Sequence, residues 1–208
     1  MDKLSLWMIL LLVVGIGGGC SSGSGTSQSG AGSSTASSSQ QKIVFTGAST
    51  IARGNWSYYF GIPIDNKGVS GIESTELKNN IESQVSSKPD KIFISIGINN
   101  ILNRHESLLL GDVAIIFDKI RVASPTTKVY FISIIPINDN FSNSLIERYN
   151  DQIQSLCSTK NVKFISVYSL FKSLTTIINL NYYQADGIHL NELGYQVYAD
   201  AIRSYVLS

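Results

Sequence analysis

Four polar side chains of the sequence are of the types that acyl transfer uses: Ser49, Asn99, Asp186 and His189. A serine hydroxyl becomes a nucleophile when a neighbouring base takes its proton. Histidine is the natural base near neutral pH, and a carboxylate fixes its tautomer and stabilises the imidazolium. An amide side chain, like the backbone N–H of a glycine, can stabilise the oxyanion that forms during the reaction. Together these residue types indicate ester chemistry.

Asp186 and His189 are three residues apart, directly before a predicted helix. A turn at this point can bring the carboxylate against one ring nitrogen and leave the other nitrogen free for catalysis. Each candidate alone also has an ordinary structural interpretation, because serine is a common helix N-cap and both Gly71 and Asn99 are typical of turns. The other histidine, His105, lies in a polar loop and is interpreted as a solvated residue.

The segments that must position these residues alternate between strand and helix. Short, continuously apolar segments predict strands, and apolar residues at intervals of three and four predict helices. The strands are predicted over 42–46, 62–67, 91–96, 128–135 and 162–167, and the helices over 72–85, 108–122, 145–157 and from 191 onward. This alternation favours a three-layer α/β/α fold, a doubly wound, flavodoxin-like parallel sheet of about five strands.

In open parallel sheets of this kind the site forms at the carboxyl ends of the strands. The residues to consider are therefore those that follow the strands, at 47–50, 68–71, 97–100 and 183–189. These four segments contain all the candidate residues named above. The predicted fold thus brings them to one edge of the sheet.

The same four segments resemble the sequence blocks of the SGNH, or GDSL-type, serine hydrolase family, over essentially all of residues 42–208. The matching stretches are Phe-Thr-Gly-Ala-Ser at 45–49, Asn-Lys-Gly-Val-Ser-Gly at 66–71, Gly-Ile-Asn-Asn at 97–100 and Asp-Gly-Ile-His at 186–189. The resemblance implies Ser49 as the nucleophile, His189 as the base and Asp186 as the residue that orients it. It implies an oxyanion hole made of Ser49, Gly71 and Asn99, and no cofactor.

The sequence departs from the family pattern at two positions. Ala48 stands where the family has the aspartate of Gly-Asp-Ser, and Asn100 stands where it has a second acid. Neither position supplies a member of the implied triad. We therefore expect the departures to alter the rate more than the catalytic role.

Composition excludes several other classes of protein. The formal net charge is +1 with 15% charged residues, so no basic stripe suggests a nucleic-acid partner. With two histidines and two cysteines, no cluster suitable for a metal emerges, and no dinucleotide-binding glycine fingerprint is present. Cys157 falls on the apolar side of a predicted helix, and we interpret it as a small buried side chain.

The N-terminal residues predict export. An apolar segment over 4–16 is too short to span a bilayer comfortably and is typical of a signal peptide, here residues 1–19. Small residues followed by Cys20 resemble a bacterial lipoprotein signal, which implies lipidation of Cys20. Residues 20–41 are rich in Ser and Gly and are expected to form a flexible tether to the domain at 42–208. The expected location is the cell envelope, anchored at the periplasmic face of the outer membrane or at the cell surface.

The leading hypothesis is a serine ester hydrolase, either a carboxylesterase or a carbohydrate O-deacetylase, acting on a small-molecule or carbohydrate ester. A lipase, a thioesterase or an acyltransferase of the same fold is an alternative. A protein of a different class also remains open, an envelope-tethered binding protein with little activity. Ala48 and Asn100 are the residues that keep this last alternative open.

Overall fold

The computed structural model describes residues 40–175 and 177–208. The predicted signal peptide over 1–19, the predicted lipidation at Cys20 and most of the tether over 20–41 lie outside the described residues. They stay predictions.

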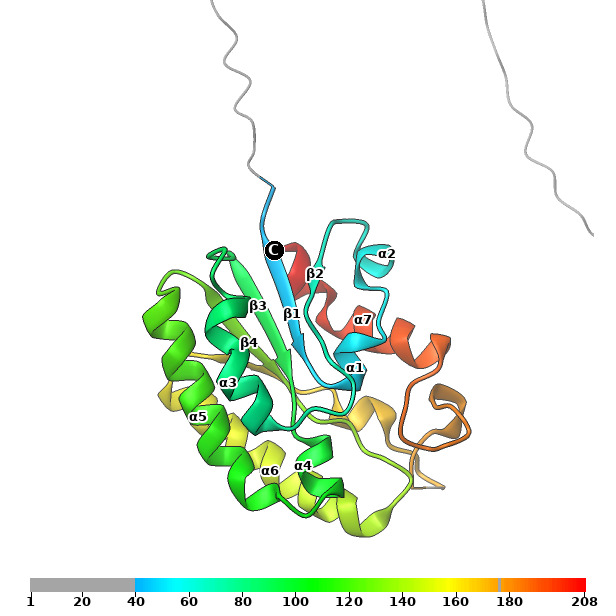
Figure 1. Ribbon diagram of the computed structural model, residues 1–208. Helices are drawn as coiled ribbons and strands as arrows, with labels where there is room; N and C mark the ends of the chain where they lie inside the picture. Colours follow the sequence, from blue (N-terminus) through cyan, green and yellow to red (C-terminus); the bar gives the residue numbers. More distant parts are fainter. Residues whose placement is uncertain (1–39, 176) are drawn as a thin grey trace, which may run out of the picture. The chain divides into compact units, whose positions relative to one another are not determined.

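Five strands form one parallel sheet (Figure 1). They are β1 (Ile43–Gly47), β2 (Asp65–Asn66), β3 (Lys91–Ser95), β4 (Lys128–Ile132) and β5 (Lys163–Ile165), in the order β2-β1-β3-β4-β5. The order of the strands reverses at β1, so the sheet grows in both directions from its first strand. The predicted five-stranded α/β fold is confirmed.

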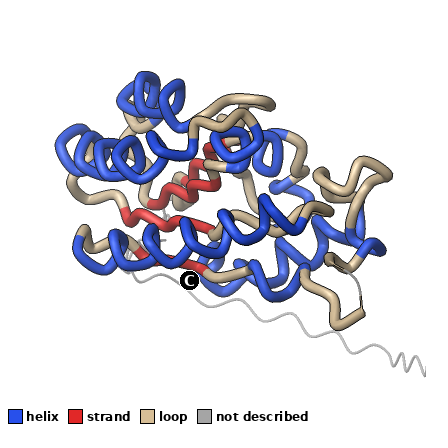
Figure 2. The backbone as a smooth tube through the Cα atoms, turned by 90° about the horizontal axis from the view of Figure 1, so that it is seen from below, coloured by secondary structure: helices blue, strands red, loops and turns tan. Residues whose placement is uncertain are grey.

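Helices cover both faces of the sheet, and Figure 2 shows the strands between two helical layers. The longer helices are α3 (Ser74–Gln84), α5 (Glu106–Ala123), α6 (Asn140–Thr159) and α7 (Glu192–Leu207). Short helices follow β1 and β3: α1 (Ser49–Ala52), α2 (Trp56–Phe60) and α4 (Ile98–Leu102). Two single 3-10 turns, η1 (Tyr168–Phe171) and η2 (Leu180–Tyr182), connect β5 to α7.

Alternate residues of each strand point to opposite faces and fill two separate apolar clusters. Val44, Ile92 and Ile94 point to the face covered by α3, α5 and α6. Phe45 and Phe93 point to the other face, where they pack with α2 and α7. All five side chains are at most 2% exposed. Because both faces of the sheet are buried, its strands are continuously apolar in the sequence.

The fourth strand ends three residues earlier than its apolar sequence predicts. The sequence predicts a strand over 128–135, but β4 ends at Ile132. Beyond it, the buried side chain of Asn150 on α6 accepts the N–H of Ile134 at 2.9 Å and donates to its C=O at 2.9 Å. Asn143 binds the N–H and C=O of Ile137 in the same way, at 2.8 and 2.7 Å. Two amide side chains thus replace a neighbouring strand and hold residues 134–137 in an irregular path.

No helix within the described ranges, 40–175 and 177–208, is both long and apolar enough to cross a membrane.

Candidate functional site

Ser49 lies at the tight turn between β1 and α1. Gly47 makes the turn possible, because its φ of 138° suits glycine and a side chain there would collide with the carbonyl group of Ser95. The N–H of Ala48 donates to that same carbonyl oxygen at 3.1 Å. Ser49 is then the first residue of α1 and is 7% exposed. The turn therefore holds Ser49 at the carboxyl edge of the sheet, beside the end of β3.

Ala48 occupies the position where the family has an aspartate. Its side chain is buried and makes no hydrogen bond to cap α1. Instead it lines a pocket together with Ser49 and several isoleucines. The alanine makes the floor of this pocket apolar, where an aspartate would place a carboxylate.

Asp186 makes three hydrogen bonds, two with His189 and one with Ile188. The Nδ1 atom of His189 lies 2.6 Å from Oδ2 of Asp186. The other carboxylate oxygen accepts the backbone N–H groups of Ile188 and His189, each at 2.9 Å. Asp186 is 42% exposed and His189 24% exposed, so the pair lies at the surface with its ring partly covered. The hydrogen bond from His189, the backbone N–H of His189 and that of Ile188 together lower the pKa of Asp186 to about 2.

The loop that carries this pair is closed on itself and held against the segment after β4. Gln184 donates its N–H to the carbonyl oxygen of His189 at 2.7 Å, and Gly187 donates to Gln184 at 3.0 Å. Gly187 has a φ of 65° and its C=O accepts the N–H of Asn138 at 2.8 Å. The turn needs glycine both for this φ and because a side chain would collide with Asn138. The loop is therefore fixed at both ends of the Asp186–His189 pair.

Asn99 and the segment after Gly71 are brought together at the same edge of the sheet. The side-chain amide of Asn99 donates to the carbonyl oxygen of Ile72 at 2.8 Å. Gly71 has a φ of 85°, a left-handed conformation that places the loop on its path into α3. The loop also runs beside β1, because the N–H of Val69 donates to the carbonyl oxygen of Gly47 at 2.9 Å. An amide has two N–H groups, so the bond to Ile72 leaves the second N–H of Asn99 for another acceptor.

Asn100 has a structural role that explains its presence in place of an acid. It is fully buried, accepts the N–H of Ser74 at 3.0 Å and donates to the Ser74 hydroxyl at 2.9 Å. That hydroxyl in turn donates to Asp112 at 2.8 Å. Burial raises the pKa of Asp112, but hydrogen bonds from Lys78, Thr75 and Ser74 outweigh it and leave the pKa below its usual value. The negative charge thus sits on Asp112 of α5, and the neutral amide of Asn100 completes the network.

The pocket beside Ser49 is small and is lined by isoleucine side chains together with three hydroxyl-bearing side chains. Its lining residues are Ala48, Ser49, Thr50, Ser95 and six isoleucines, at 96, 98, 134, 135, 137 and 188. The space inside it is about 10 Å³, room for about one water-sized group. The pocket brings Ser49 together with Ile188, the residue that precedes His189. Ser49 and the residue that precedes His189 in the chain therefore border the same small space.

His105 lies outside this pocket, at the end of the loop that follows α4. Its Nδ1 atom is 2.9 Å from a carboxylate oxygen of Glu73, and its side chain is 57% exposed. Hydrogen bonds from Asn103 and His105 lower the pKa of Glu73. Its exposure agrees with the interpretation as a solvated residue, and its ion pair with Glu73 is an added finding.

The isoleucines of the pocket wall were not among the residues selected from the sequence. Ile134 and Ile135 are predicted as the end of a strand that Pro136 closes, because apolar residues continue beyond β4. The strand already ends at Ile132, before the proline. Within the described part of the chain, no group of three or more His, Cys, Asp or Glu side chains could hold a metal ion.

Comparison with known families gives a match over most of the chain. Residues 32–197 match the model of the GDSL-like Lipase/Acylhydrolase family. The comparison with curated proteins found no match.

Similar solved structures share the fold. A Streptococcus pneumoniae protein provisionally described as a platelet activating factor is 26% identical, with a TM-score of 0.74 over 83% of this chain and 86% of that chain. The acetylxylan esterase Axe2 from Geobacillus stearothermophilus is 18% identical, with a TM-score of 0.67 over 80% of this chain and 94% of that chain. A GDSL-like lipase from Bacteroides thetaiotaomicron is 19% identical, with a TM-score of 0.68 over 80% and 88%.

Proposed function

The chain belongs to the GDSL-like lipase/acylhydrolase family and is a hydrolase acting on ester bonds, and we propose that it uses Ser49, His189 and Asp186 to remove short acyl groups, acetyl above all. The observation that carries the proposal is the apolar pocket that Ser49 shares with Ile188. One site then contains a nucleophile, a base already paired with its carboxylate and a space for an acyl group.

The geometry of the Asp186–His189 pair supports the role of His189 as the general base. The carboxylate binds Nδ1 of the ring, at 2.6 Å, which fixes the tautomer with the proton on that nitrogen. The lone pair of Nε2 is then available to take the proton of the Ser49 hydroxyl. The low pKa of Asp186 keeps it ionised throughout the neutral range, so it stabilises the imidazolium that forms.

The proposed reaction follows from these roles. Ser49 Oγ forms a bond to the ester carbonyl carbon while Nε2 of His189 takes the hydroxyl proton. The oxyanion accepts hydrogen bonds from the N–H groups of Ser49 and Gly71 and from the free amide N–H of Asn99. The bond to the leaving alcohol then breaks, and the alcohol departs with the proton from His189. Water, deprotonated by His189, attacks the acyl-serine and releases the acid and the free serine.

The size of the pocket supports a short acyl chain. A space of about 10 Å³ has room for one small group, such as the methyl of an acetyl ester. Its walls are branched isoleucine side chains, which have few alternative rotamers with which to enlarge it. A long-chain lipase requires a larger apolar groove at this position. An O-deacetylase of carbohydrate esters is therefore favoured over the lipase alternative, and the similar structure of an acetylxylan esterase agrees with this choice.

The location belongs to the same proposal. We propose that residues 1–19 direct export, that Cys20 is lipidated and that residues 20–41 tether the enzyme in the cell envelope. Replacing Cys20 by serine in the full chain tests the anchor: the account expects release from the membrane fraction, and unchanged fractionation contradicts it.

Turnover of a series of p-nitrophenyl esters tests the catalytic proposal. The account expects hydrolysis of the acetate well above that of the butyrate and octanoate, and loss of turnover in both Ser49→Ala and His189→Ala. His105→Ala is the matched control, because that histidine also pairs with a carboxylate but lies outside the pocket. Wild-type turnover no higher than that of the two site variants would favour the weakly active binding protein instead. Octanoate turnover above acetate turnover would favour the lipase.

A further inference from the structure

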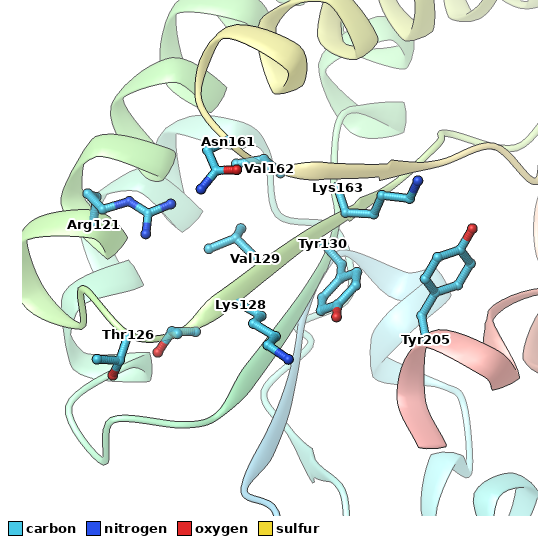
Figure 3. A pocket seen from close by; sticks show the side chains of 10 residues that line it. Arg121, Thr126, Lys128, Val129, Tyr130, Asn161, Val162, Lys163 and Tyr205 are labelled. Carbon is cyan, nitrogen blue, oxygen red and sulfur yellow. The ribbon is translucent and has the colours of Figure 1, made fainter. Parts of the chain in front are cut away.

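A second pocket lies at the opposite edge of the sheet, at the amino ends of β4 and β5 (Figure 3). Its volume is about 570 Å³, within the range of ordinary ligand sites. Three cationic side chains line it, Arg121, Lys128 and Lys163, together with the rings of Tyr130 and Tyr205. Since the proposed catalytic residues lie at the carboxyl ends of the strands, this pocket is separate from the catalytic site.

The three cations have no carboxylate partner within the part of the chain that the structure describes. Lys163 places its ammonium group 5.8 Å from the centre of the Tyr205 ring, and Arg121 donates to the carbonyl oxygen of Pro125 at 3.1 Å. By contrast, Lys119 and Lys160 are paired with Glu82 and Asp118. Positive charge is therefore left unneutralised at the pocket, although the whole chain has a formal net charge of only +1.

The same edge receives the N-terminal segment of the domain. Lys42 directly precedes β1, and its carbonyl oxygen accepts the N–H of Asp90 at 2.8 Å. The carbonyl oxygen of Asp90 accepts the N–H of Lys128 at 2.9 Å. The strand register continues this row, because Tyr130 on β4 pairs with Lys163 on β5. We call Lys42, Arg121, Lys128 and Lys163 the basic edge.

One acid, Asp90, lies at the same edge of the sheet. The Asp90 carboxylate accepts the backbone N–H of Lys42 at 2.7 Å. Lys91, the first residue of β3, is buried and donates its ammonium protons to the carbonyl oxygens of Tyr205 and Val206 at the end of α7. The charge of Lys91 is thus used by the fold, whereas the four exposed cations of the basic edge outnumber the single carboxylate of Asp90.

We propose that the basic edge binds the phosphate groups of an anionic lipid bilayer and holds the domain with its catalytic edge directed away from the membrane. Lysine and arginine side chains close to an anionic membrane each add attraction to its phosphates. The chain enters the domain at Lys42, within the basic edge, so a tether anchored in the bilayer leads to this side of the domain. A lipid anchor and a basic surface are the two weak signals that together give stable membrane association.

Vesicle binding by residues 39–208 tests the proposal. This segment forms one compact unit that contains both apolar clusters of the sheet, so it carries its own core. It also lacks Cys20, so binding reports on the basic edge and not on the anchor. The proposal expects co-sedimentation with vesicles of phosphatidylcholine and phosphatidylglycerol, none with phosphatidylcholine alone, and a decrease at high salt. Lys128→Gln with Lys163→Gln should weaken partitioning by roughly 25-fold, about 5-fold for each lysine.

Lys119→Gln with Lys172→Gln is the matched control, because it removes the same charge from lysines paired with glutamates elsewhere. It should retain vesicle binding, and both double variants should retain turnover of p-nitrophenyl acetate. Equal loss in the two double variants overturns the proposal, as does equal binding to both kinds of vesicle. Binding of inorganic phosphate or of soluble polygalacturonate without vesicle binding also overturns it, in favour of a soluble anion or an acidic polysaccharide.

Discussion

Asp186 uses both of its carboxylate oxygens to hold a single residue, His189. Oδ2 lies 2.6 Å from the ring nitrogen Nδ1, and Oδ1 accepts the backbone N–H of the same histidine at 2.9 Å. The ring and the backbone of His189 are thus fixed by one side chain three residues earlier. The proposed base therefore has its orientation set before a substrate arrives, which is the condition for efficient proton transfer.

Asp186→Asn separates the two functions of this carboxylate. The amide oxygen can still accept the N–H groups of Ile188 and His189, so the loop should keep its shape. The replacement cannot stabilise an imidazolium and favours the wrong tautomer, so kcat should fall by about 10³–10⁴-fold. Steady-state kinetics on p-nitrophenyl acetate, with the thermal midpoint measured beside it, checks this prediction. A loss of kcat below tenfold would remove Asp186 from the proposed triad.

The low pKa of Asp186 also predicts a pH dependence of stability. The folded-state pKa is about 2, below the ordinary value near 3.8. The carboxylate therefore stabilises the fold above about pH 4, and this contribution disappears as the pH falls through 2. The difference in Tm between wild type and Asp186→Asn should shrink as the pH falls below about 4. Thermal unfolding followed by circular dichroism measures it, and a difference that grows on acidification contradicts the assignment.

The isoleucine side chains that line the pocket beside Ser49 predict selectivity for the length of the acyl chain. Ile137→Val removes one methylene from the pocket, where Ile137 is 2% exposed. The ratio of propionate to acetate turnover should rise by about tenfold, since one methylene in an apolar pocket is worth 10-fold or more in discrimination. Ile81→Val is the matched control, because Ile81 is equally buried in α3 but does not line the pocket. A change of the ratio in both variants, or in neither, would argue against the pocket as the acyl site.

The two hydrogen bonds between the Asn150 side chain and the backbone of Ile134 predict a large contribution of this buried amide to the free energy of unfolding. Asn150→Ala leaves the N–H and C=O of Ile134 without their partner in the interior, at a cost of about 2–3 kcal/mol in the free energy of unfolding. Gln154 lies one turn later on α6 and is exposed. Gln154→Ala should change the free energy of unfolding by less than about 0.5 kcal/mol. Urea unfolding at equilibrium compares the two. A similar loss of unfolding free energy in both variants would show that Asn150 does not hold residues 134–137 in place.

Asn100→Asp restores the family residue and should destabilise this protein. The new carboxylate cannot donate to the Ser74 hydroxyl, and it faces Asp112 across that hydroxyl. We expect a loss of about 2 kcal/mol at neutral pH, because a buried donor is removed and two like charges share one site. The cost should decrease at low pH, where carboxyl groups take protons. When Asp112 is also replaced by Asn, the cost of Asn100→Asp should decrease by about 1 kcal/mol or more. An unchanged cost in that background would show that the two carboxylates do not interact.

The strands and the long helices could be predicted because their residues carry regular apolar patterns. Val44 and Phe45 point to opposite faces, yet both are buried, which is why β1 is continuously apolar in the sequence. The end of β4 could not be predicted from that pattern, because Ile134 and Ile137 are as apolar as the strand itself. Their path depends on Asn150 and Asn143, which approach from a helix and leave no local signal.

The site shows the same division between local and long-range features. Asp186 and His189 are three residues apart, so their contact follows from a local turn. The pocket beside Ser49 is assembled from four separate segments, and its small size depends on how they pack. The proposed preference for short acyl groups depends on this pocket, so local sequence patterns could not supply its physical reason.

The account's central claim is that Ser49 forms a covalent acyl-enzyme with His189 as its base. The most direct measurement is reaction of the protein with a fluorophosphonate probe, followed by mass spectrometry of the labelled peptide. The account predicts one label, on the peptide that contains Ser49, with no labelling of Ser49→Ala and much slower labelling of His189→Ala. Labelling of a different residue, or equal labelling of wild type and both variants, would contradict it.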